Sequence, residues 1–245
     1  MIGEITNAQG EKLDYRFHEA ASNRDRKHLV VIGHGVTANL DRPWAEGLAD
    51  GLAGAGIPAL RFSFSGNGAS GGDFGDCTIS KEVADLGCVL DAVEAAGFTA
   101  SYAGHSMGGA VGVIRTAGDR RIRHFISLAG MVETRRFCEE EFGDQTPGEG
   151  LMWDDEDCPL SRAFVDDMAA IGSVAPTAAG IHVPYLLVHG SDDDLVPIAE
   201  ARGIFAVANE PKKLVVLDGV DHVFNGDGRQ QMVDAVVAWM TEQLR

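Results

Sequence analysis

One serine flanked by glycines has the clearest chemical potential in this 245-residue chain. The pentapeptide at residues 104–108 reads Gly-His-Ser-Met-Gly, with Ser106 at its centre. In a sharp strand-to-helix turn, such a Gly-x-Ser-x-Gly motif exposes the serine hydroxyl above a sheet. Chance alone gives roughly 0.2 matches in a chain of this composition, so the motif needs structural context. That context is present, because a strand-like run precedes the motif and helical spacing follows it.

A serine hydroxyl becomes a nucleophile when an imidazole accepts its proton and a carboxylate holds the imidazole in the required tautomer. Both groups occur downstream of Ser106. Three aspartates at 192–194 follow the apolar run 185–189, and His222 follows the run 213–217. Serine, acid and histidine therefore occur in the order typical of hydrolases that carry the Gly-x-Ser-x-Gly turn.

Alternating strand-like and helix-like segments must position these groups. Short apolar runs separated by segments with helical spacing predict a mostly parallel sheet with helices on both faces, an α/β fold. Ligands of such sheets bind beyond the carboxyl ends of the strands, where the serine, the aspartates and the histidine all fall. The strands are expected at 2–6, 13–17, 29–33, 58–64, 99–104, 122–128, 185–189 and 213–217, and the helices at 43–53, 83–93, from 107, at 198–208 and at 230–244.

The composition excludes several classes of protein. With 20 basic against 37 acidic residues, the formal charge of −17 makes a nucleic-acid partner implausible. Neither a membrane-spanning run nor a signal peptide is apparent, so we expect a cytoplasmic protein that does not bind membranes. The four cysteines form no Cys-x-x-Cys pair, so a zinc site and a disulfide framework are not expected. A homodimer is compatible with these features.

The acidic residues are concentrated in one segment. Twelve carboxylates and three arginines lie between residues 131 and 170, and the strand-helix alternation is interrupted from 131 to 180. We interpret 131–180 as an acidic lid inserted into a single domain spanning 1–245, because loops of this length usually have a function. Its charge predicts neutral or cationic substrates rather than anionic ones.

These motifs together resemble the α/β-hydrolase superfamily over essentially the whole chain. The resemblance implies that Asp193 is the acid, that His222 is the base, and that the backbone N–H groups of Val36 and Met107 form an oxyanion hole. The segments 34–44 and 61–86 are more narrowly similar to compact cinnamoyl and feruloyl esterases and to serine-aminopeptidase-like, lysophospholipase-like hydrolases.

The predicted function is that of a serine carboxylesterase that hydrolyses small acyl or aryl esters through an acyl-enzyme, without a metal or another cofactor. Trp153 and Met152 in the lid, together with His34, are the expected substrate-pocket residues, and His34 is also expected to shape the oxyanion loop. An aminopeptidase or amidase, a thioesterase or acyltransferase, and a noncatalytic binding protein of the same fold are the alternatives.

Overall fold

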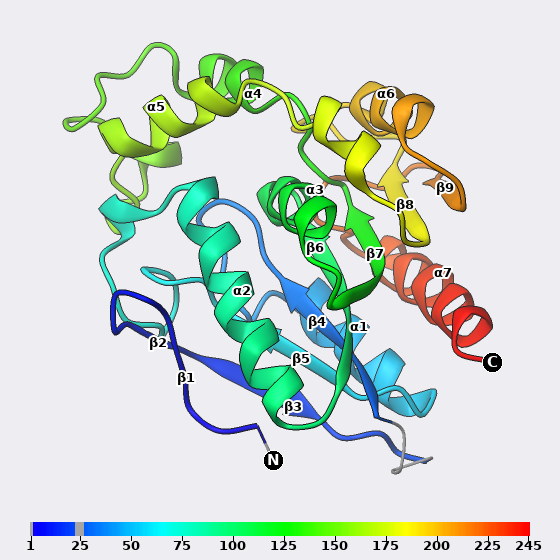
Figure 1. Cartoon of the computed structure of the whole chain (residues 1–245). Coiled ribbons are helices and arrows are strands. Elements are labelled where there is room, and N and C mark those ends of the chain that lie inside the picture. Colours follow the sequence, from blue (N-terminus) through cyan, green and yellow to red (C-terminus); the bar gives the residue numbers. More distant parts are fainter. Residues whose placement is uncertain (1, 23–26) are drawn as a thin grey trace.

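A seven-stranded sheet forms the centre of the protein (Figure 1). The structure is a computed structural model and describes residues 2–22 and 27–245. Among the described strands of this sheet, β3 is antiparallel to its neighbour β5 and the others run parallel. Across the sheet the order is β3 (Tyr15–His18), β5 (Ala59–Phe62), β4 (His28–Gly33), β6 (Thr99–His105), β7 (Ile122–Leu128), β8 (Tyr185–Gly190) and β9 (Lys212–Leu217).

Helices cover both faces of the sheet because its central strands are apolar on both sides. In β4, Leu29 and Val31 belong to one apolar core, whereas Val30 and Ile32 belong to the other. One core is covered by α2 (Ile79–Ala95), α3 (Met107–Gly118) and α6 (Ile198–Val207), and the other by α1 (Pro43–Gly54) and α7 (Asp227–Gln243). The predicted α/β fold with a mostly parallel sheet is confirmed.

The N-terminal hairpin differs from the prediction in its second strand. The expected strand 13–17 is divided into β2 (Lys12–Leu13), which pairs with β1 (Ile5–Thr6), and β3, which pairs with β5 instead. The division falls at Asp14, whose backbone N–H donates to Ser70 Oγ and whose carbonyl accepts from the Ser63 N–H. The chain therefore leaves the small two-stranded sheet and becomes the edge strand of the large one.

The segment 131–180, here called the cap, lies beyond the carboxyl ends of the parallel strands (Figure 1). It contains α4 (Thr134–Phe142) and α5 (Arg162–Ile171), with short 3-10 turns at Met152–Asp154 and Pro176–Gly180. A third 3-10 turn, Phe74–Asp76, precedes α2. The cap has an apolar underside continuous with the core, formed by Phe137, Phe142, Met152, Leu160, Phe164 and Met168.

Two carboxylates connect the cap to the rest of the fold. Glu200 of α6 accepts from the backbone N–H groups of Val132 and Glu133, 2.6 and 3.0 Å away, just before α4. Asp167 of α5 accepts from the backbone N–H and the hydroxyl of Ser80 at the start of α2. Both contacts lie at helix N-termini, where a negative charge is stabilising.

Within residues 2–22 and 27–245, no helix has the length and apolar character required to cross a bilayer.

Gly112 lies where α3 passes closest to the sheet. A Cβ at this position would overlap the ring of Phe125 and come within 2.8 Å of the ring of Tyr102, both of which are fully buried. Because neither ring can yield without disturbing its neighbours, we expect Gly112→Ala to lower the free energy of unfolding by about 1–3 kcal/mol.

Gly118, at the end of the same helix, has no atom within 4 Å of its would-be Cβ. The matched Gly118→Ala change should leave stability unchanged or raise it by up to about 1 kcal/mol. Urea unfolding of both variants measures the difference. Equal stabilities would contradict the close packing of α3 on β6 and β7.

Candidate active site

Ser106 lies in a tight turn between β6 and α3. Its backbone has φ 53° and ψ −121°, a region that L-residues rarely adopt. A Cβ at Gly104 would overlap the carbonyl oxygen of Gly108, and a Cβ at Gly108 would overlap the carbonyl oxygen of His34. The two glycines of the motif are therefore required by the close approach of backbone to backbone. The Ser106 N–H donates to the Leu128 carbonyl (3.0 Å), which fixes the turn against β7.

Asp193 and His222 lie in adjacent loops and are hydrogen-bonded. His222 Nδ1 lies 2.8 Å from Asp193 Oδ2, and both side chains are buried. Asp193 Oδ1 accepts from the N–H groups of Leu195 (3.1 Å) and Val196 (2.8 Å). Because the carboxylate accepts at Nδ1, the Nε2 atom of a neutral His222 ring has a free lone pair.

His189 also contacts the Asp193 carboxylate, with Nε2 3.1 Å from Oδ2 and 2.7 Å from the Val196 carbonyl. Burial opposes the ionisation of Asp193. The hydrogen bonds from His189 and His222 outweigh it and hold the pKa of this carboxyl well below its ordinary value. Asp193 is therefore an anion that faces two histidines.

The neighbouring aspartates are arranged differently. Asp192 is exposed and accepts from the hydroxyl of Ser191 (2.9 Å), and Asp194 is exposed. In the described part of the chain, neither side chain is bonded to His222. Residue type alone does not show which of these three aspartates pairs with the histidine. In the fold, Asp193 is the one directed toward His222.

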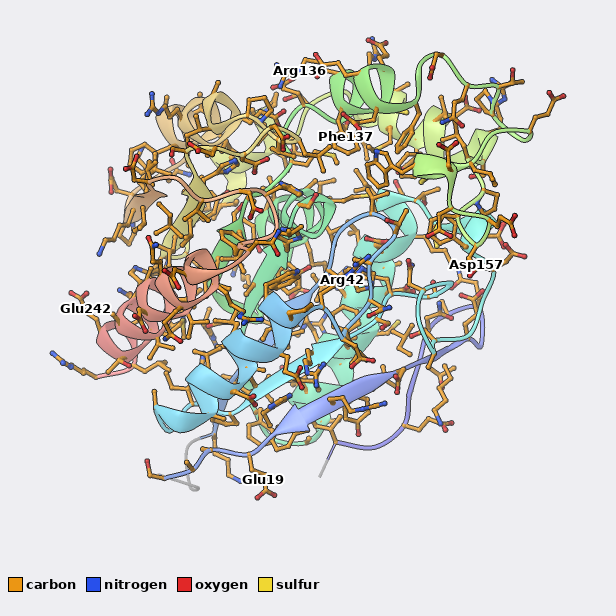
Figure 2. All side chains as sticks on the ribbon, turned by 180° about the vertical axis from the view of Figure 1, so that it is seen from behind. Glu19, Arg42, Arg136, Phe137, Asp157 and Glu242 are labelled. Carbon is orange, nitrogen blue, oxygen red and sulfur yellow. The ribbon has the colours of Figure 1, made fainter. Side chains whose placement is uncertain are left out.

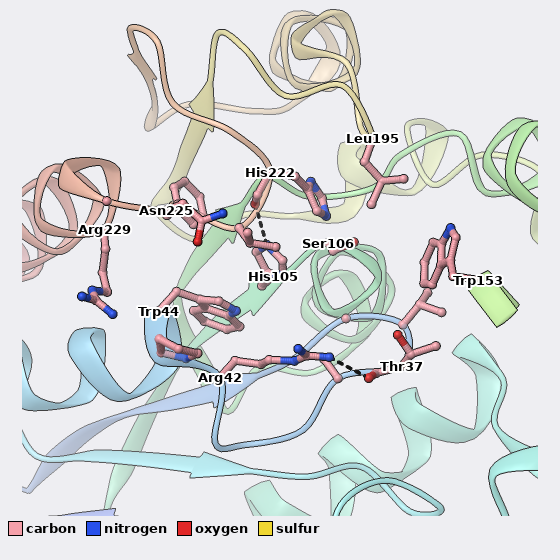
Figure 3. A pocket seen from close by; sticks show the side chains of 17 residues that line it. Thr37, Arg42, Trp44, His105, Ser106, Trp153, Leu195, His222, Asn225 and Arg229 are labelled. Carbon is pink, nitrogen blue, oxygen red and sulfur yellow. Dashed lines mark hydrogen bonds between the residues drawn. The ribbon is translucent and has the colours of Figure 1, made fainter. Parts of the chain in front are cut away.

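Ser106 and His222 line one pocket with a volume of about 310 Å³ (Figure 3). Ser106 Oγ makes no hydrogen bond within the described residues, and its residue is 4% exposed. Catalytic hydrogen bonds are often long before substrate binds, so the missing serine-histidine bond is compatible with a nucleophilic role. The pocket lies beyond the carboxyl ends of the strands, as the sequence predicts.

The segment that follows β4 approaches Ser106 closely. A Cβ at Gly35 would lie 2.7 Å from the Cβ of Ser106, so a larger residue would displace the serine. Val36 lines the pocket, and Met107 is the first residue of α3. Across residues 2–22 and 27–245, the N–H groups of Val36 and Met107 have no hydrogen-bond acceptor. Two unsatisfied donors therefore flank the serine.

His34 and Met152 do not line this pocket, contrary to the prediction. His34 donates from Nδ1 to the Gly35 carbonyl (2.9 Å) and accepts at Nε2 from the N–H of Phe64 (3.0 Å). Burial lowers its pKa to about 4, so this ring is neutral and joins the Gly35 loop to the end of β5. Met152 is buried in the apolar underside of the cap because the chain turns sharply at the next residue.

Trp153 does line the pocket. Its φ of 51° directs the indole away from the buried Met152. The ring contacts Phe142, with 5.1 Å between centroids, and its Nε1–H donates to Glu141 (2.8 Å). The indole is 42% exposed, so part of an aromatic face is available to a ligand.

His105, next to the serine, is hydrogen-bonded to the backbone of His222. Its Nε2–H donates to the His222 carbonyl (2.9 Å), and its ring contacts Trp44 at 4.6 Å between centroids. Burial, with a smaller contribution from His222, lowers the pKa of His105 to about 3, so the ring stays neutral. His105 also lines the pocket.

Two arginines, Arg42 and Arg229, are pocket residues that sequence reasoning missed. They are the formally charged residues of the described lining, which contains no carboxylate. Nothing in the sequence separated them from the other 18 basic residues. Their positions depend on how α1 and α7 meet at the pocket, which local patterns do not specify.

No cluster of three or more His, Cys, Asp or Glu side chains suited to a metal ion occurs in the described ranges. The four cysteines are free thiols, and burial raises the pKa of Cys77 to about 12.

Comparison with known proteins shows similarity to hydrolases in sequence and in fold. Residues 24–142 match the sequence model of a hydrolase family described as serine aminopeptidase. Est1E from Butyrivibrio proteoclasticus, solved with ferulic acid, superposes with a TM-score of 0.89 over 99% of each chain at 24% identity. The esterase domain of a Rhodothermus marinus protein gives a TM-score of 0.75 at 20% identity, over 97% of this chain and 95% of that one.

Curated relatives are similar over shorter stretches. An uncharacterized protein of Mycobacterium tuberculosis is 37% identical over 86 residues, or 34% of this chain and 29% of that protein. A monoacylglycerol lipase of Mycolicibacterium smegmatis is 34% identical over 88 residues, or 35% and 30% of the two chains. The matched segments thus span less than a third of these relatives.

The fold is that of the α/β hydrolases, and the turn at Ser106 lies between a strand and a helix of this fold. The chain has the fold of the α/β hydrolases, and the match of residues 24–142 to a hydrolase family model supports a hydrolase.

The low pKa of Asp193 predicts how stability depends on pH. A carboxyl whose pKa is depressed in the folded state stabilises the protein above its unfolded pKa, near 3.8, and loses that contribution as pH falls toward the folded value. We expect Asp193→Asn to cost about 2 kcal/mol at neutral pH. The deficit should shrink below pH 4.

Unfolding of the wild type and of Asp193→Asn, followed across the acid range, measures this deficit. A pH-independent difference would mean that the charge of Asp193 does not stabilise the fold.

Proposed function

We propose that this protein is a serine carboxylesterase acting on small acyl or aryl esters. The observation that carries the proposal is the Asp193–His222 hydrogen bond of 2.8 Å, buried beside a pocket that His222 and Ser106 share. An ionised carboxylate, a neutral imidazole and a hydroxyl without a hydrogen-bond partner are the parts that nucleophilic acyl transfer needs.

In the proposed reaction, Ser106 Oγ attacks the ester carbonyl carbon while His222 Nε2 takes the hydroxyl proton. The resulting oxyanion accepts hydrogen bonds from the N–H groups of Val36 and Met107, which are preorganised by the turn and the Gly35 loop. Collapse of this intermediate breaks the bond to the alcohol, which receives the proton from His222. Water then attacks the acyl-enzyme with His222 as base, releasing the acid and restoring Ser106.

The pocket lining disfavours an aminopeptidase. Recognition of a free N-terminal ammonium requires a nearby anion, but the charged residues of the described lining are Arg42 and Arg229. Glu141 of the cap accepts from the Trp153 Nε1–H but does not itself line the pocket. A thioesterase would use the same residues, so thioesters belong in the substrate panel. Est1E was solved with ferulic acid, which makes methyl ferulate a reasonable aryl test ester.

A fluorophosphonate probe should label the wild-type protein at Ser106, because the probe reacts with activated serines. Ser106→Ala should not be labelled and should lower kcat/KM for p-nitrophenyl acetate by at least about a thousandfold. Circular dichroism of the variant provides the control for folding. Failure of the folded wild type to react would support the noncatalytic alternative instead.

Asp193→Asn should lower kcat by about a thousandfold or more, because the amide no longer enforces the His222 tautomer or stabilises the imidazolium. Asp192→Asn and Asp194→Asn are matched controls in the same loop and should change kcat less than about threefold, since both side chains are exposed and not bonded to His222. Steady-state kinetics on p-nitrophenyl butyrate measures all three variants. A larger loss in either control would reassign the acid.

A further inference from the structure

The charge of the pocket is opposite to that of the protein surface. The chain has a formal charge of −17, and most carboxylates of the cap are exposed at its periphery, as Asp157 shows in Figure 2. Arg42 lies near the centre of the same view, between α1 and the cap. Arg42 and Arg229 are the formally charged residues of the described lining, which contains no carboxylate.

Arg42 is the residue before α1 and its guanidinium is held near the nucleophile. One of its N–H groups donates to the Thr37 carbonyl (2.9 Å), which orients the group while leaving its other N–H donors available. Within the described residues, this side chain has no ion-pair partner. In Figure 3 Ser106 lies between Arg42 and His222, and all three line the pocket.

Arg229, in the first turn of α7, lies at the other end of the pocket from Trp153 (Figure 3). Its aliphatic stem packs against Gly47, since a Cβ there would lie 3.2 Å from Arg229 Cδ. Its guanidinium has no ion pair or hydrogen bond with any residue in the described ranges. Trp44 lies between Arg229 and Ser106 in this view. The pocket therefore has an aromatic end at Trp153 and a cationic end at Arg229.

We propose that the pocket selects esters that carry a carboxylate elsewhere in the molecule, with Arg42 as the residue that binds this carboxylate and Arg229 as a second positive charge. A guanidinium binds a carboxylate through paired N–H donors, and such charge-assisted bonds are strong. This specificity is the opposite of the one predicted from the acidic cap, because a charge in the lining acts at shorter range than screened carboxylates on the surface.

The proposal rests on the proposed esterase function, and the test separates the two. One substrate pair is monomethyl terephthalate and its neutral amide, methyl 4-carbamoylbenzoate, in which the carboxylate is on the acyl side. The other pair is 4-acetoxybenzoate and 4-acetoxybenzamide, in which it is on the alcohol side. Each kcat/KM is divided by the rate constant for hydroxide hydrolysis of the same ester, which removes differences in intrinsic reactivity.

At low salt, the normalised kcat/KM of the wild type should be about fivefold higher for the anionic ester than for the neutral one in at least one pair. This factor is the upper end of the effect that a partly exposed ion pair produces. Added salt should reduce this preference. Arg42→Gln should bring the ratio of the anionic to the neutral kcat/KM close to one. Arg229→Gln should reduce this ratio by a smaller factor. Taking the ratio of the two substrates cancels any general effect of Arg42 on the nearby loop.

Arg202→Gln is the charge-matched control. Arg202 is an exposed residue of α6 that does not line the pocket, so this variant should keep the wild-type ratio. Preference for the amides in both pairs, or a ratio unchanged by Arg42→Gln and Arg229→Gln together, would overturn the proposal and leave the esterase intact. Failure to hydrolyse any of the four esters, with no fluorophosphonate labelling, would instead refute the function on which it rests.

Discussion

The close approach of three backbone segments around Ser106 is the constraint on which the site depends. The end of β4, the turn after β6 and the start of α3 meet at distances that leave no space for a Cβ at Gly35, Gly104 or Gly108. This contact forces the strained backbone of the serine, and it also brings two unbonded N–H groups beside the hydroxyl. The proposed nucleophile and the proposed oxyanion donors thus arise from one packing contact, whereas Asp193 and His222 come from the loops after β8 and β9.

The proposed acid and base, Asp193 and His222, are held by hydrogen bonds rather than by close backbone packing. Asp193 accepts four hydrogen bonds, two from backbone N–H groups and two from histidine rings. His222 is fixed at both ends, because Asp193 orients its ring and the His105 Nε2–H donates to its carbonyl. Burial of these groups strengthens each interaction and keeps His105 neutral. The imidazole can therefore turn little, which is what directional proton transfer requires.

The sequence was sufficient to predict the fold, the turn at Ser106 and the position of His222, because alternating apolar runs and glycine spacing are local signals. It could not decide among the aspartates at 192–194 from residue type alone, since the choice depends on which side chain the loop directs inward. The residues that line the pocket were more difficult to predict from the sequence. Met152 and Trp153 are adjacent, yet a positive φ at Trp153 separates their directions, and Arg42 reaches the pocket only because α1 begins there.

Trp153 is the one described lining residue that comes from the cap. The other described lining residues come from the segments at the carboxyl ends of β4, β6, β8 and β9 and from the first turns of α1 and α7. The cap also contacts the turn at Ser106 through its first residue, because the Met131 N–H donates to the Ser106 carbonyl (3.0 Å). Beyond Met131, a change in the cap would therefore alter the described pocket wall through Trp153. Selection can thus act on this aromatic end of the pocket and on the turn at Ser106 through different parts of the gene.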